Sequence, residues 1–169
     1  MRMSDSTATT VKPIYQHTQI GYVSLIIIAL VLVWYAWKFR RAPNYSSVDN
    51  VSGPLMVYLP VVIAVIMGMF ITLTVRITPH NVSWLFGPGL IRGGIEVSDI
   101  AQARTVETSL LTGFGIRHTA SGVLYNVSGT GAVEFRLQNG GQVKLGTDDA
   151  TGMLAALRQA GVQTADSTK

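Results

Sequence analysis

The chain lacks cysteine and is poor in charge. Without cysteine it has no disulfide framework, no cysteine-ligated zinc or iron–sulfur centre and no thiol nucleophile. Charged residues make up 13% of the 169 residues, about half of the usual share of roughly 25%. Hydrophobic residues make up 48%, which argues against a disordered chain. This balance predicts a membrane protein with a modest water-exposed part.

The net charge of +4 is not concentrated on a folded domain. Residues 1–54 hold five basic and two acidic groups, residues 55–75 hold none, and residues 76–169 hold eight basic and seven acidic groups. A nucleic-acid-binding domain needs a basic stripe on its folded surface. The distribution therefore excludes nucleic acid as a main partner.

Two long uncharged runs predict a transmembrane hairpin. Residues 20–37 form the first, which follows a polar N-terminal segment at 1–19 and ends at Lys38. Residues 55–75 form the second, which contains Pro60 and ends at Arg76. Each run is long enough to cross a bilayer, and aromatic residues lie near the ends of the first. The polar loop at 38–54 is too short for a domain, so both outer ends are predicted on the same side of the membrane.

The sequence after the second uncharged run predicts short strands separated by turns. Asn139-Gly140 is a strong hairpin signal, because both residues accept a positive φ. A closing helix follows, capped at its start by Thr147 or Asp148 and ended by Gly161. The expected strands are 73–78, 82–86, 90–97, 103–108, 123–127, 133–137 and 142–145. The predicted fold class is α+β: a transmembrane hairpin, then a seven-stranded antiparallel barrel or sandwich over 76–161 with a C-terminal helix, and a polar tail at 162–169.

Several short strings resemble the bacterial pleckstrin-homology-like (PH-like) membrane proteins. They are residues 84–89 (WLFGPG), 97–100 (VSDI), 113–117 (GFGIR), 125–129 (YNVSG) and 143–149 (VKLGTDD). The similarity covers about residues 73–160. It implies a PH-type barrel carried on a membrane hairpin, in proteins mostly of undefined function, and it supplies no ligand. The segment at 78–81 lacks the basic cluster with which lipid-binding PH domains hold phosphoinositides.

The stretch at 109–122 is the most informative candidate site. In one interpretation Leu111 and Phe114 dip into a lipid interface while Arg117 and His118 meet headgroups or a partner protein. In the other, the stretch folds over the barrel, its apolar residues join the core, and Arg117 pairs with a carboxylate. Both interpretations stay open from the sequence.

No pattern predicts catalysis, a metal or a cofactor. Asp148 and Asp149 are too few ligands for a hard cation and suit a helix start instead. The three histidines have no metal-site spacing, and no nucleophile with an evident activator is present. We therefore expect a protein that is not an enzyme.

The predicted function is a PH-like interaction module at the membrane surface that docks a partner protein or self-associates. The first alternative is a lipid-headgroup or envelope-state sensor that uses 109–122, and the second is an accessory subunit of a transport complex. Expected partners are membrane lipids and a protein or a second copy. The expected location is the cytoplasmic membrane, crossed twice. Basic residues in the 38–54 loop favour a barrel outside the cell, whereas the resemblance favours a cytoplasmic barrel, which we prefer.

Overall fold

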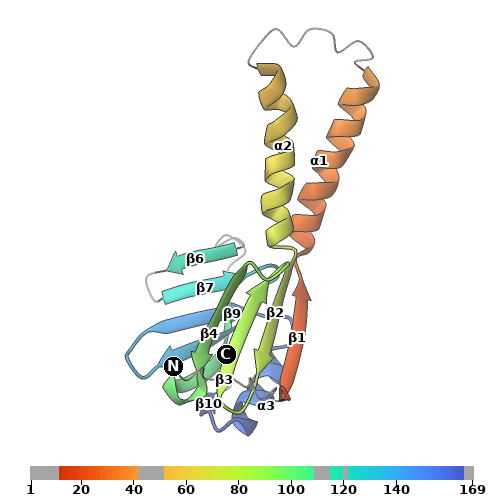
Figure 1. The fold of residues 1–169 in the computed structure, drawn as a ribbon. Coiled ribbons are helices and arrows are strands. Elements are labelled where there is room, and N and C mark those ends of the chain that lie inside the picture. The colour runs from red at the N-terminus through yellow and green to blue at the C-terminus, as the bar shows by residue number, and fades with distance from the viewer. Residues whose placement is uncertain (1–11, 42–51, 109–114, 120–121, 166–169) are drawn as a thin grey trace, which may run out of the picture.

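The computed structural model describes residues 12–41, 52–108, 115–119 and 122–165. Within those ranges, the helices labelled α1 and α2 project from one end of a β-rich body (Figure 1). The elements in chain order are β1 (Tyr15–Ile20), α1 (Tyr22–Arg41), α2 (Ser52–Met69), β2 (Thr72–Ile77), β3 (Asn81–Phe86), β4 (Ile91–Glu96), a short 3-10 helix (Val97–Asp99), β5 (Ile100–Glu107), β6 (Gly115–Thr119), β7 (Gly122–Asn126), β8 (Gly131–Leu137), β9 (Gln142–Gly146), α3 (Ala150–Gln159) and β10 (Thr164–Ala165).

The strands of this described part form two sheets. The first has the order β1-β2-β3-β4, with every neighbouring pair antiparallel. The second has the order β10-β5-β8-β9-β7-β6, and its β10–β5 and β7–β9 pairs are parallel. We call them sheet A and sheet B. Helices α1 and α2 together form an insertion between the two neighbouring strands β1 and β2 of sheet A.

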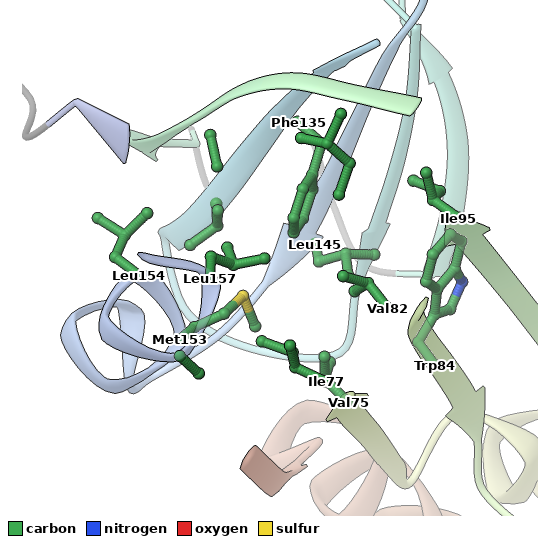
Figure 2. Packing of buried hydrophobic residues seen from close by; sticks show 14 of the residues in the cluster. Val75, Ile77, Val82, Trp84, Ile95, Phe135, Leu145, Met153, Leu154 and Leu157 are labelled. Carbon is green, nitrogen blue, oxygen red and sulfur yellow. The ribbon is translucent and has the colours of Figure 1, made fainter. Parts of the chain in front are cut away.

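The core lies between the inner faces of the two sheets and is closed by α3 (Figure 2). In β3 every second residue, Val82, Trp84 and Phe86, is buried, as expected for a strand with one face on a core. Phe135 in β8 is fully buried, and α3 contributes Met153 to the same cluster. The packing of this core is thus explained by the alternating inward residues of the strands and by one apolar face of α3.

The structure contradicts the predicted PH-like fold, a seven-stranded antiparallel barrel or sandwich. Each expected strand has a counterpart in the structure within a few residues, but β1, β6 and β10 join them and two strand pairs are parallel. The hairpin also does not precede the β structure, because β1 lies on its N-terminal side. Part of the predicted polar segment at 1–19 is therefore a strand. Its inward positions carry Tyr15, His17 and Gln19, which hid the usual apolar alternation.

The predicted transmembrane hairpin is contradicted as well. Among the helices of the described ranges, none combines the length and the apolar character needed to cross a membrane. The reason lies in the element boundaries. Ile20 belongs to β1, so α1 has 16 uncharged residues before Lys38, about 24 Å of helix against about 30 Å of bilayer hydrocarbon. Helix α2 ends at Met69, and Thr72 to Val75 lie in β2 instead of the predicted span at 55–75.

The predictions of a membrane protein and of a two-pass cytoplasmic-membrane location are corrected by the same finding. By contrast, two local predictions are confirmed. Asn139-Gly140 turns the chain between the antiparallel strands β8 and β9, with φ +84° at Gly140. Helix α3 lies where the closing helix was expected, and Gly161 follows its end with φ +90°.

Candidate functional site

The most unusual surface of the molecule is on the two projecting helices. Large apolar side chains on both are exposed, up to 66% for Val33 and for Tyr58. We call this set the hairpin surface: Tyr22, Leu25, Ile26, Leu30, Leu32, Val33, Trp34 and Trp37 of α1, with Tyr58, Leu59, Val61, Val62, Ile63, Val65 and Ile66 of α2. Each of these fifteen side chains is at least 37% exposed. Monomeric proteins rarely expose so many large apolar side chains together, and where they do the surface usually marks an interaction site.

The base of the hairpin is fixed to sheet A. Gly21 joins β1 to α1, and its N–H donates to the carbonyl of Ile71 at 2.6 Å. A Cβ at Gly21 would lie 2.7 Å from the Phe70 carbonyl oxygen, so only glycine fits this close approach. Phe70 packs edge-on against Phe86 with ring centres 5.4 Å apart. These contacts hold the hairpin surface away from the core.

The far end of α1 is basic and aromatic. The Lys38 ammonium lies 5.2 Å from the centre of the Trp34 ring, and the Arg41 guanidinium lies 4.4 Å from that of Trp37. These are cation–π distances, and cations at a helix C-terminus also oppose its partial negative charge. The hairpin surface therefore ends in a positively charged rim.

The structure describes two of the four predicted site residues. Leu111 and Phe114 lie outside the described residues. Arg117 and His118 are exposed on β6, at the edge of sheet B, so part of the predicted 109–122 loop is a strand. Ile116 beside them is 37% exposed. The lipid-headgroup or envelope-state sensor built on these residues stays a prediction.

One residue of the acidic pair before α3 caps the helix, but it is Asp149 and not the predicted Thr147 or Asp148. Asp149 is the N-cap, and its carboxylate accepts a hydrogen bond from the Gly152 N–H at 2.9 Å. Thr147 accepts from the Asp149 N–H, and His17 contacts Asp148 at 2.5 Å. No group of three or more metal-ligating side chains occurs in the described residues.

Strand β1 is tied to this helix start through Tyr15. The Tyr15 hydroxyl donates to Asp149 Oδ2 at 3.0 Å. Burial, the hydrogen bond to Asp149 and the charge of that carboxylate raise the pKa of the Tyr15 hydroxyl above its ordinary value. The Tyr15 hydroxyl therefore stays protonated, and can donate this hydrogen bond, over the pH range in which proteins are usually handled.

Asp149→Ala is expected to lower the free energy of unfolding by about 1–2 kcal/mol, because it removes the cap of α3. The same change removes the acceptor of the Tyr15 hydroxyl. Urea denaturation followed by circular dichroism measures the effect. Asp148→Ala is the matched control: its carboxylate is 60% exposed, and we expect a loss below about 0.5 kcal/mol. Equal losses in the two variants would contradict the assignment of the cap.

Three strands of sheet B are joined by a cluster of ion pairs around one buried carboxylate. The sequence did not predict this cluster. Glu134 is 2% exposed, and its carboxylate lies 2.7 Å from Arg104, 3.3 Å from Lys144 and 3.5 Å from Arg136. Arg104, Glu134 and Lys144 occupy facing positions of β5, β8 and β9. Burial by itself would raise the pKa of Glu134, but the hydrogen bonds and charges of Lys144 and Arg104 outweigh it and lower the pKa below the ordinary value. Glu134 is therefore ionised at neutral pH.

Comparisons of the chain with protein-family models, with curated proteins and with solved structures find no match. The resemblance to bacterial PH-like membrane proteins therefore stays a prediction.

Proposed function

We propose that this chain is a non-enzymatic interaction module that self-associates through the hairpin surface. The observation that carries the proposal is the exposure of large apolar side chains on both α1 and α2. Leaving such a surface in water is unfavourable by roughly 25 cal/mol for each Å² of apolar area. A partner that covers it gains that free energy on association.

The size and the distribution of the hairpin surface support a second copy as this partner. A standard protein interface takes about 20–30 residues on each side, and the fifteen side chains of the hairpin surface would supply a large part of one. Residues next to each other in sequence, Leu32, Val33 and Trp34, are all exposed, so apolar groups cover more than one side of α1. Two hairpins packed together would form a four-helix bundle with apolar side chains at its centre. Such an isologous contact needs no further protein.

The hairpin's projection from the β body also supports this arrangement (Figure 1). Helices that extend beyond the sheets can meet the hairpin of another copy while the two β bodies stay apart. The sheets would then be carried in pairs and would present duplicate surfaces to ligands or further partners.

Sedimentation velocity on the full-length chain tests the proposal. We expect the wild type to be a dimer, and the double substitution Leu30→Glu with Val33→Glu to raise its dissociation constant at least about 100-fold, because two charges per copy would be buried unpaired. The matched control is Leu90→Glu. Leu90 is 72% exposed but lies outside the hairpin, so that variant should remain dimeric.

The same three proteins are then mixed with neutral phosphatidylcholine vesicles and separated by flotation. A dimeric wild type that does not float supports self-association. A monomeric wild type, or one that floats as a monomer with vesicles while the Leu30→Glu and Val33→Glu variant does not, would overturn it, and floating would identify lipid as the occupant of the surface. Unchanged dimerisation in the double variant would also overturn it.

A further inference from the structure

We propose that a hollow on the outer face of sheet A binds an oxyanion, a phosphate or carboxylate group carried by a small molecule. The hollow has a volume of about 460 Å³ and lies over β2, β3 and β4. Arg76 and Arg92 both line it, together with Ser83, Gly94 and Trp84. Small-molecule sites commonly have volumes of roughly 300–1,000 Å³ with a few placed polar groups.

The strand register aims two arginines at one place. Arg76 of β2 faces Ser83 of β3, which faces Gly94 of β4, while Arg92 faces Leu85 one pleat further along. Ser83, Arg76 and Arg92 thus share the outer face, opposite the buried Trp84 and Phe86 positions of β3. Strand spacing puts the Cα atoms of the two arginines roughly 12 Å apart. An arginine side chain extends far enough for both guanidinium groups to meet one anion between them.

These two arginines lack the carboxylate partners that other basic residues have. Arg104, Arg136 and Lys144 surround Glu134, whereas Arg76 and Arg92 form no ion pair with any carboxylate of the described ranges. Both are exposed. The guanidinium group presents fixed N–H donors that match the oxygens of a carboxylate or phosphate in pairs. The hollow therefore has a local positive charge that an oxyanion would neutralise.

The charged groups around the hollow leave this positive charge in place. Glu96 is the acidic residue of β4, and it lies beside a separate hollow with His80 and Ser98. Its carboxylate accepts a hydrogen bond from the Ser98 hydroxyl at 3.3 Å. Glu96 is opposite Asn81, two positions beyond Gly94, and does not line the arginine hollow.

The remaining lining groups favour a small ligand with a polar end. Gly94 lies opposite Ser83 on this outer face, and as a glycine it leaves the floor of the hollow between the two arginines without a side chain. Leu85 and Pro88 add an apolar wall that would contact the body of the ligand. The ligand class is therefore a compact phosphate ester or carboxylic acid.

Nuclear magnetic resonance of the full-length ¹⁵N-labelled chain tests this site with inorganic phosphate and with acetate as probes. We expect saturable shifts of the Ser83 and Gly94 amide resonances, while the indole resonances of Trp34 and Trp37 stay fixed. Trp34→Phe and Trp37→Phe spectra assign those two indoles. Stronger binding of phosphate would identify the phosphate class, and stronger binding of acetate would identify the carboxylate class.

Three variants test whether the probes bind at this hollow, and one of them is the control. Arg76→Gln and Arg92→Gln should each weaken binding at least tenfold, whereas Arg117→Gln, on exposed β6, should leave it unchanged. The absence of a saturable shift with either probe would overturn the proposal. An equal loss in Arg117→Gln would also overturn it, because it would show attraction to overall charge and not to this hollow.

Discussion

Phe135→Ala is expected to lower the free energy of unfolding by about 4 kcal/mol, the largest loss from a single substitution proposed for this chain. Phe135 is fully buried in β8, between β5 and β9, and belongs to the cluster that also contains Leu145 and Met153 (Figure 2). Truncation removes the apolar atoms and leaves a cavity, because the strands on both sides hold the backbone in place. Globular domains have roughly 5–15 kcal/mol in total, so this variant would be close to unfolding.

Urea denaturation at neutral pH, followed by near-ultraviolet circular dichroism, measures the Phe135 effect. Phe135→Leu is the matched control, since it keeps most of the volume and should cost less than about 1.5 kcal/mol. A loss below about 1 kcal/mol for Phe135→Ala would show that this position is not at the centre of the core.

Glu134→Ala is expected to lower the free energy of unfolding by about 3 kcal/mol at neutral pH. The change leaves Arg104, Arg136 and Lys144 close together without their shared carboxylate. Removing one partner of a buried ion pair costs about 3–5 kcal/mol, and the lower end applies because the basic side chains are partly exposed. Glu107→Ala, at an exposed position of β5, is the control and should change stability by less than about 0.5 kcal/mol.

The Glu134 effect also has a defined pH dependence. The pKa of Glu134 is lower in the folded than in the unfolded chain, so its contribution is fully present above the unfolded pKa of about 4.3 and is lost as the pH falls through the folded pKa. The difference in stability between wild type and Glu134→Ala should therefore be constant near neutrality and shrink below about pH 4. A difference that stays the same from pH 7 to pH 3 would contradict an ionised, paired Glu134.

Local sequence patterns predicted well where the strands lie. They predicted poorly how the strands pair. Alternation around Phe135 and the turn at Asn139 are properties of neighbouring residues, and both elements are found. The parallel pairing of β7 with β9 joins residues about 20 positions apart, as in Val123 with Val143, and no local signal encodes it. Strand β6 was not predicted, because Arg117 and His118 were assigned to a loop of mixed apolar and basic residues.

The candidate sites show the same division. The apolar runs that contain Leu30 and Val62 are evident in the sequence, but their interpretation depended on where the helices begin and end. The Glu134 cluster and the pair of Arg76 with Arg92 exist only because sheet register brings distant residues onto one face. A lone arginine in an alternating segment gives no sequence signal of its partner.

The direct junctions between hairpin and sheet give the molecule a mechanical property. One residue, Gly21, separates β1 from α1, and two residues separate α2 from β2, so no slack linker lies between them. A pull on the hairpin is carried straight into β1 and β2, which move together because Gly21 is hydrogen-bonded to Ile71. Along the strand axis that force loads the β2–β3 ladder in shear, with its bonds stretched all at once and not one after another. Tension on the hairpin is therefore expected to reach β1 and β2 directly and, through β2, the face of sheet A that carries the two arginines.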